Sequence, residues 1–287
     1  MRAIPPFFAH YQTRVEGELR RLVPENETPV ERSMAYTLHA PSKRVRAVLT
    51  MLAAQLCGGS EQRALTAAAV IEMVHAASLI LDDLPAMDDA PLRRGKPANH
   101  REFGEAIAIL AAFGLLNGAF GALAREYEPP LASDLSTLLA DAVGTEGLIG
   151  GQAADLLATE REITFHTLER IHRGKTGALF VAAATAGALT ADARHDWIAA
   201  LTAFAKNLGL AFQIVDDLLD VEGNPAETGK ATRTDLKKTT FVSFSGVEGA
   251  HQIAAELCAT AERALAPFGA RADRLRELSA FVATRNV

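Results

Sequence analysis

The fold is decided by long apolar segments that end in carboxylates, and the clearest of them is LGLAFQIVDDLLD, residues 208–220. Its first eight residues are almost wholly apolar, which predicts a helix that stays buried until it reaches the acids. In a helix Asp216 and Asp220 stand one turn apart on the same face, with Asp217 beside them. Carboxylates this close repel one another unless a cation lies between them, so the stretch predicts a metal site rather than a solvated helix end. Oxygen ligands that leave room for phosphate oxygens suit magnesium.

A second apolar segment ends in Asp82-Asp83-Leu84-Pro85-Ala86-Met87-Asp88. Pro85 should disturb the helix, because proline has no N–H to donate and clashes with the preceding turn. An undistorted helix would turn residues 82 and 88 apart, so the chain must loop for Asp88 to reach the ion bound by Asp82 and Asp83. This spacing alone is weak evidence. Together with the cluster of Asp216, Asp217 and Asp220 it becomes strong evidence for a site where metal ions hold a diphosphate.

The composition excludes several classes of protein. Of the 287 residues, 49% are hydrophobic and 22% are charged, which suits one domain with a large core. Alanine and leucine dominate and aromatic residues make up 6%, which favours helix over strand. The formal net charge of -6 gives no general attraction for nucleic acid. The two cysteines, Cys57 and Cys258, lack metal or redox spacing, so we expect a reducing, cytoplasmic location.

Residues 107–124 form the most membrane-like segment, but Asn117 and three glycines interrupt it and Glu105 precedes it. This pattern predicts a buried core helix and no membrane span. No apolar run of signal-peptide length follows Met1, so we expect no secretory leader.

Helical signals run almost throughout, with no convincing hairpin, and predict a single all-α domain over residues 1–287. Two long loops are expected, residues 85–101 and 222–245, and each directly follows an aspartate cluster, as functional loops often do. The expected helices cover roughly residues 6–22, 43–57, 62–84, 103–125, 131–158, 166–188, 194–221, 247–265 and 270–284.

Basic side chains accompany the acids, as an anionic substrate of an acidic protein requires. Arginine forks match diphosphate oxygens and lysine supplies a point charge, although any one such residue alone is more commonly a solvated surface charge. His75 lies seven residues before Asp82 and so shares its helix face. The basic residues are Lys43, Arg44, Arg46, Arg93, Arg94, Lys175, Lys230, Lys237 and Lys238.

With these motifs the chain resembles the trans-prenyl diphosphate synthases, and most closely the bacterial carotenoid-type geranylgeranyl diphosphate synthases. The resemblance covers roughly residues 40 to 245, and two aspartate motifs in this order with an Arg-Arg pair between them make it specific. The matching stretches are Ser42-Lys43-Arg44-Val45-Arg46, residues 72–78 and 82–97, Gly147 to Leu156 with Gly150-Gly151-Gln152 and Asp155, Lys175-Thr176, residues 212–220, Gly229-Lys230 and Lys238-Thr239-Thr240.

The resemblance implies the isoprenoid synthase fold, a large antiparallel helix bundle around a deep central cavity, in a homodimer. It implies that the two aspartate clusters hold about three Mg²⁺ ions per active site. The implied metal ligands are Asp82, Asp83, Asp88, Asp216, Asp217 and Asp220. Arg93, Lys175 and Lys230 would hold the allylic diphosphate, while Lys43, Arg46, His75 and Arg94 would hold isopentenyl diphosphate. Thr176 and Gln213 would line the reacting carbons, and Lys238 would help to close the mouth.

The implied reaction is chain elongation by ionisation, condensation and elimination. Isopentenyl diphosphate attacks allylic diphosphates of five, ten and fifteen carbons. Cations stabilise the leaving diphosphate, and a dry apolar cavity protects the carbocation from water. No side chain stands out as the base, and the departing diphosphate is the expected proton acceptor. The residues expected in the chemistry are Asp82, Asp83, Asp88, Lys175, Thr176, Gln213 and Asp216.

Product length should depend on the residues below the first aspartates. Ser78 is one helical turn below Asp82, with Ala77 beside it and Val74 and Met73 a turn deeper. These small side chains leave the floor open, so we expect a C20 product, with a C15 product, as in a farnesyl diphosphate synthase, as the alternative. A deeper floor is expected from Phe113 or Leu116 of the next helix.

Two alternatives compete with a synthase. A class I terpene cyclase shares the first aspartate motif, but it lacks an aspartate-rich second motif and a second diphosphate site. A catalytically silent partner subunit usually loses aspartates from one motif, and all six are present here. The chain also departs from the family at Pro41-Ser42, where relatives have Gly-Gly. Ser42 is expected to cap the following helix there.

Overall fold

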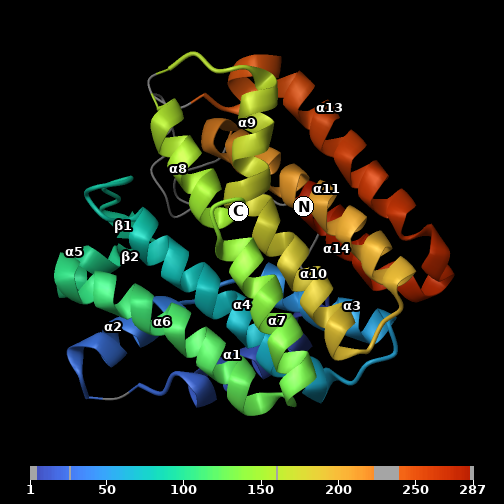
Figure 1. The fold of residues 1–287 in the computed structure, drawn as a ribbon. Helices are drawn as coiled ribbons and strands as arrows, with labels where there is room; N and C mark the ends of the chain where they lie inside the picture. The colour runs from blue at the N-terminus through green and yellow to red at the C-terminus, as the bar shows by residue number, and fades with distance from the viewer. Residues whose placement is uncertain (1–4, 26, 160, 223–238, 285–287) are drawn as a thin grey trace.

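The computed structural model describes residues 5–25, 27–159, 161–222 and 239–284, and these form an all-α bundle with one small hairpin (Figure 1). The all-helical class predicted from the sequence is confirmed. The helices are α1 (Phe7–Leu22), α2 (Pro29–Leu38), α3 (Val45–Leu56), α4 (Glu61–Asp82), α5 (Asn99–Phe103), α6 (Glu105–Glu126), α7 (Pro129–Val143), α8 (Leu148–Ala158), α9 (Phe165–His172), the π-helix η1 (Arg173–Gly177), α10 (Ala178–Thr190), α11 (His195–Glu222), α13 (Phe241–Ala264), the 3₁₀-helix η2 (Ala266–Ala272) and α14 (Asp273–Thr284).

The core surrounds α3, α4 and α10, which are buried on nearly all sides. Small residues allow these helices to approach closely. A Cβ on Gly187 of α10 would lie 2.2 Å from the carbonyl oxygen of Thr50 in α3, so only glycine fits there. Helix α4, which ends in the first aspartates, is buried along most of its length within this core.

A second apolar cluster packs around the C-terminal half of α11, which carries Asp216, Asp217 and Asp220. Its members come from α9, α11 and α13, and include Leu168, Ile214, Leu218 and Phe241. Because α11 is packed here on both α9 and α13, the end of the helix has a defined position even though it lies away from the main core.

Several element boundaries differ from the expected ones. Helix α2 was missed, although Thr28 and Glu31 form a reciprocal capping box and Pro29 occupies the first turn, which are local start signals. The single helix expected over 131–158 is wrong, because residues 144–147 separate α7 from α8. The helix expected over 166–188 is also interrupted, by η1.

The expectation of no hairpin was wrong. Strands β1 (Leu92–Arg93) and β2 (Lys96–Pro97) pair antiparallel in the loop that follows the first aspartates. The two turn residues, Arg94 and Gly95, have φ of 53° and 75°, as the tight turns of two-residue hairpins require. A two-residue strand is too short for an alternating apolar pattern to reveal it.

The start of α3 also differs from expectation. Its cap position is Arg44, with φ of 53° and no side-chain cap, and the helix begins at Val45. Ser42 is therefore not the cap, and its Oγ instead accepts a hydrogen bond from the Arg44 amide at 3.2 Å.

Three of the described helices, α4, α6 and α11, are long and apolar enough to cross a membrane on length and composition alone. They differ in how far the bundle covers them, since 78% of the most apolar stretch of α4 is buried but only 39% of that of α6. Helix α6 therefore has an outward apolar face, and the absence of a membrane span stays a prediction.

Candidate active site

The first aspartate cluster is folded back on itself. Asp82 is the last residue of α4, and Asp83 follows at its C-terminal cap. The loop after Pro85 returns, so that the Asp88 amide donates to the Asp82 carbonyl at 3.0 Å and the Ala90 amide donates to the Asp83 carbonyl at 3.2 Å. The expectation that the chain loops to bring Asp88 beside Asp82 is thus confirmed for the backbone.

Asp83 is bound from the hairpin. The Arg93 guanidinium donates to both carboxylate oxygens, with Nε at 3.0 Å and 3.1 Å, and Asp83 is only 2% exposed. Burial by itself would lower the Arg93 pKa, but the hydrogen bonds and charge of Asp83 outweigh it and raise the pKa above its ordinary value. This pair ties the hairpin to the end of α4. The metal role of Asp83 and the diphosphate role of Arg93 stay predictions.

Lys175 lies between two carboxylates from different helices. Its Nζ donates to Oδ2 of Asp155 in α8 at 2.7 Å and lies 3.8 Å from Oδ2 of Asp82. The residue belongs to η1, and single π-turns within helices are frequent at functional sites. Lys175 was expected to hold the allylic diphosphate, and the structure places it beside Asp82, an implied metal ligand. Its role toward the diphosphate stays a prediction.

Glycines bring α8 and η1 into backbone contact. A Cβ on Gly151 would lie 2.1 Å from the Lys175 amide nitrogen, and one on Gly174 would lie 3.0 Å from the Gly151 Cα. No side chain fits at either position. Asp155 stands one turn after Gly151 and so meets the Lys175 side chain. Asp155 lies in a stretch that matches the family, but its role cannot be predicted from the sequence, because it meets Lys175 only in the folded chain.

The next residue along η1 contacts the second aspartate helix. Thr176 Oγ1 donates to Gln213 Oε1 at 2.8 Å, and Gln213 Nε2 donates to Asp217 Oδ1 at 3.0 Å. Asp217 Oδ2 accepts from the Phe241 amide at the start of α13 at 2.9 Å. Neighbouring residues Lys175 and Thr176 thus contact the two aspartate-bearing helices, α4 and α11. The structure brings together the residues expected at the reacting carbons.

The three acids of α11 differ in their surroundings. Asp217 is 4% exposed, and both its oxygens accept hydrogen bonds from protein groups, whereas Asp216 and Asp220 are half-buried. A carboxylate held in this way at a helix N-terminus stabilises that helix. The metal role of Asp217 stays a prediction, and its observed contacts are structural.

A cluster of positive charge lies beside α4. Arg46 Nη1 is 3.5 Å from His75 Nε2, and the Arg46 guanidinium stacks 4.7 Å from the ring centre of Phe180 and 5.5 Å from that of Phe212. Burial, and then the charges of Arg46 and nearby arginines, hold the His75 pKa well below its ordinary value, so the imidazole is neutral at pH 7.

Arg94 adds to this cluster. Burial and the charge of Arg44 lower the Arg94 pKa to about 10, which leaves the guanidinium protonated at neutral pH. Of the residues expected around isopentenyl diphosphate, Arg46 lies beside His75, and the charge of Arg94 also contributes to the low pKa of His75. The fourth, Lys43, lies with its Nζ 5.4 Å from the ring centre of Phe281, and its role stays a prediction.

Arg44 has a structural role. Its guanidinium is buried, lies 3.3 Å from Oε2 of Glu72 and donates to the carbonyl of Leu38 at 2.5 Å. Glu72 in turn accepts from the Ala47 amide at 3.3 Å. The pair joins α2, α3 and α4 beneath the cluster of arginines.

Within the described ranges no three His, Cys, Asp or Glu side chains converge into a preformed metal cage. Magnesium commonly takes one or two carboxylates and completes its shell with water and substrate phosphates. The returned loop of Asp82 and Asp88, and the half-buried pair Asp216 and Asp220, fit ions that bind in this way. Lys230 and Lys238 lie outside the described residues.

Comparison with known proteins gives the family. The model of the family described as polyprenyl synthetase matches residues 27–263. The chain belongs to the polyprenyl synthetase family. It is 37% identical to the farnesyl diphosphate synthase of Bacillus subtilis, over 98% of this chain and 97% of that protein. It is 40% identical to the geranylgeranyl diphosphate synthase of Cyanophora paradoxa, over 95% of this chain and 93% of that protein.

Solved structures agree. An FPP/GFPP synthase from Zymomonas mobilis superposes with a TM-score of 0.87, at 33% identity, over 97% of this chain and 98% of that one. A geranyltransferase from Legionella pneumophila superposes with a TM-score of 0.85, at 31% identity, over 96% and 95%. These findings confirm the family inferred from the motifs and the isoprenoid synthase fold. This polyprenyl synthetase is therefore a prenyltransferase that makes prenyl diphosphates.

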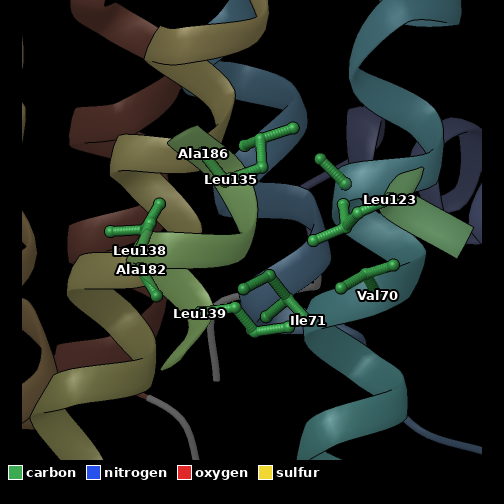
Figure 2. Close-up of a pocket in the computed structure, with 9 residues that line it drawn as sticks. Val70, Ile71, Leu123, Leu135, Leu138, Leu139, Ala182 and Ala186 are labelled. Carbon is green, nitrogen blue, oxygen red and sulfur yellow. The ribbon is translucent and has the colours of Figure 1, made fainter. Parts of the chain in front are cut away.

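A small apolar pocket of the polyprenyl synthetase lies deep in the bundle, further along α4 from the aspartates (Figure 2). Helical spacing puts Ser78, Val74, Ile71 and Ala67 on the same face of α4 as Asp82. The pocket is lined by Ala67, Val70 and Ile71 of α4, Leu123 of α6, Leu135, Leu138 and Leu139 of α7, and Ala182 and Ala186 of α10. The leucines of α7 were not expected there.

The expected floor from α6 needs correction. Phe113 is 65% exposed, so it points out of the bundle and does not close the floor within this chain. Leu116 is half-buried and packs against the main core. The helix period was assigned correctly, but periodicity alone does not say which face of an apolar helix turns inward.

Proposed function

We propose that this prenyl diphosphate synthase condenses isopentenyl diphosphate with C5, C10 and C15 allylic diphosphates to give geranylgeranyl diphosphate, with Mg²⁺ as its cofactor. The observation that supports the C20 product is the run of residues below Asp82. Ser78, Ala77 and Val74 are small or medium-sized, and the same face of α4 continues to the apolar pocket at Ile71 and Ala67.

Length supports this assignment. One helical turn advances about 5.4 Å, comparable to one isoprene unit, so Ala67 lies about 22 Å along α4 from Asp82. A C20 chain of four units therefore spans the distance from the aspartates to the pocket. A C15 chain would end about one turn above Ala67, near Ile71.

The reaction begins with cleavage of the allylic C–O bond, which leaves a carbocation and a diphosphate. Asp82, Asp88, Asp216 and Asp220 would hold Mg²⁺, which when bound adds positive charge at the leaving diphosphate. Lys175 donates to the same diphosphate. These groups lower the barrier because they act on charge that develops only as the bond breaks.

Thr176 and Gln213 act at the carbocation. Thr176 donates its hydroxyl proton to Gln213, which leaves the lone pairs of the Thr176 oxygen available to the positive carbon. Phe212 precedes Gln213 and packs against Phe180, and apolar surroundings of this kind would exclude water that would quench the cation. Isopentenyl diphosphate then attacks through its double bond, and the departed diphosphate takes the proton that is lost.

The second diphosphate would lie on the arginine cluster. Arg46 and Arg94 supply charge without a metal, and neutral His75 supplies a ring N–H. The stacking of Arg46 on Phe180 and Phe212 fixes the direction of its donors.

The test is an elongation assay. Purified protein is incubated with Mg²⁺, labelled isopentenyl diphosphate and each allylic starter in turn, and the product length is measured. A C20 product supports the proposal. A product that stops at C15 identifies a farnesyl diphosphate synthase, and no elongation by folded protein favours the cyclase or the silent subunit.

Substitution of Ala77 tests the floor. Ala77 is buried beside Ser78, about one and a half turns below Asp82, and Ala77→Tyr should obstruct the path of the growing chain and shift the product toward C15. Ala77→Ser, which keeps the volume small, is the matched control and should leave the C20 product unchanged. An unaltered product distribution in folded Ala77→Tyr would show that the chain does not descend this face.

We also propose that two copies pair through the outward face of α6. Ile109, Leu110 and Phe113 are exposed together there, whereas single exposed apolar residues are normal on any surface. The family resemblance implies a homodimer, and the cytoplasmic location expected from the cysteines is retained as part of the proposal.

A further inference from the structure

The ammonium of Lys175 lies near two carboxylates, Asp155 and Asp82, and it forms its hydrogen bond with Asp155. It lies 2.7 Å from Oδ2 of Asp155, within hydrogen-bond distance, and 3.8 Å from Oδ2 of Asp82, which is only ion-pair distance. All three side chains are largely buried, with 21%, 13% and 18% of their surfaces exposed for Lys175, Asp155 and Asp82. Solvent therefore screens the pairs less than it would at an open surface.

The backbone at Lys175 is packed closely against helix α8, which carries Asp155. Gly151 and Gly174 pack at backbone contact distance, and a methyl group would not fit at Gly151. Because α8 and η1 are locked together, Asp155 and the Lys175 backbone keep a fixed relative position. The carboxylate that Lys175 contacts therefore depends on the conformation of the lysine side chain.

We infer that Asp155 is a positioning residue: it holds the Lys175 ammonium at hydrogen-bond distance from itself and at only ion-pair distance from Asp82, so that the ammonium competes less with a divalent cation for the Asp82 carboxylate. This inference rests on the proposed function, because it concerns the metal and diphosphate of that site. Among the described residues, Asp82 is the other carboxylate that forms an ion pair with this ammonium, so it remains when the Asp155 charge is removed. A lysine and a divalent cation then compete for the same oxygens.

The competition has a measurable signature. Asp155→Asn keeps the size of the side chain and removes its charge. Mn²⁺, a paramagnetic substitute for Mg²⁺, is titrated into the protein together with a non-reactive geranyl thiodiphosphate, and free Mn²⁺ is followed by electron paramagnetic resonance. We expect the Mn²⁺ dissociation constant to rise roughly 5- to 10-fold, the size of one shifted ion pair in a part-buried site. Binding of isopentenyl diphosphate alone should not change.

A second variant distinguishes positioning from a general structural effect. In a Lys175→Gln background no ammonium competes for Asp82, so adding Asp155→Asn should leave Mn²⁺ binding unchanged. Asp155→Glu, which restores the charge, should recover most of the wild-type affinity. Thermal melting of every variant confirms that the bundle is intact.

A matched control lies on the same π-helix. Arg173 Nη2 donates to Glu169 Oε1 at 2.8 Å in an exposed ion pair. Glu169→Gln breaks this pair and should not alter Mn²⁺ binding. Equal Mn²⁺ affinity in wild type and Asp155→Asn, or the same loss in both lysine backgrounds, would overturn the inference. The two hypotheses fail in different experiments. The proposed function would fail if the wild-type protein gave no elongation product, whereas the Mn²⁺ titration tests the role of Asp155 without any turnover.

Discussion

At the scale of single residues, the aspartates show how surroundings assign different tasks to one side chain. Asp83 is buried and accepts hydrogen bonds from Arg93, and Asp217 accepts hydrogen bonds from Gln213 and from the Phe241 amide at the start of α13. Asp82 and Asp155 instead share one lysine. Spacing in the sequence groups the acids of each cluster together, but burial and hydrogen-bond partners separate those that hold the fold from those that we predict to face substrate.

The pH dependence of stability should report the environment of His75. Its folded pKa lies well below the unfolded value of about 6.5, because of burial and the charges of Arg46, Arg94, Arg93 and Arg44. The stability that comes from a neutral His75 is therefore complete above about pH 6.5 and is lost as pH falls toward the folded pKa.

We expect the melting temperature of wild type to fall more steeply between about pH 7 and pH 5 than that of His75→Gln, as measured by circular dichroism. His39, whose pKa is also lowered by burial, contributes with the same sign to both proteins, so their difference isolates His75. Parallel curves for the two proteins would show that His75 titrates normally in the folded state.

At the scale of elements, close backbone approach at glycine positions the site. Helix α8 docks on η1 only because Gly151 and Gly174 lack side chains, and α3 docks on α10 at Gly187. Sequence reasoning could place the helices from apolar periodicity and caps, because these are local signals. It could not predict η1, since a π-turn depends on the packing around it.

Gly151→Ala should damage the site through its framework. The new methyl would lie 2.1 Å from the Lys175 amide nitrogen, so α8 must shift. We expect a loss of about 1–3 kcal/mol in the free energy of unfolding, measured by urea denaturation, together with weaker allylic substrate binding.

Gly17→Ala in α1 is the matched control. Nothing lies within 4 Å of a Cβ built there, so alanine should add roughly 0.5–1 kcal/mol of stability through its better helix propensity. If Gly151→Ala were as stable as Gly17→Ala, the tight docking of α8 would not matter to the fold.

At the scale of the whole molecule, α6 has two apolar faces, one buried in the bundle and one exposed on the surface of the chain. Ala111, Leu115 and Ala119 are buried in the bundle, while Leu110 and Phe113 are exposed. The hydropathy of the segment includes the apolar residues of both faces and does not show which face is buried. The sequence could therefore predict a buried helix but not the outward surface that remains for a partner.

Phe113→Lys should weaken pairing between copies, because it places a charge at the centre of an apolar contact. We expect the molar mass measured by size-exclusion chromatography with light scattering to fall from that of a dimer toward that of one chain of 30.5 kDa. Val221→Lys, at an apolar residue on α11 that is 49% exposed, serves as control and should keep the wild-type mass. A dimer unaffected by Phe113→Lys would place the interface elsewhere.

The sequence by itself determined the all-α class, most helix positions, and the two aspartate clusters at helix ends. These properties depend on neighbours within a few residues, where periodicity and capping act. The tertiary structure alone decided which partner each charged group takes. Lys175 and Asp155 are 20 residues apart, Thr176 and Gln213 are 37 apart, and the pocket joins leucines of α7 to α4. Such contacts follow from how helices pack, which is a property of the whole chain rather than of any segment.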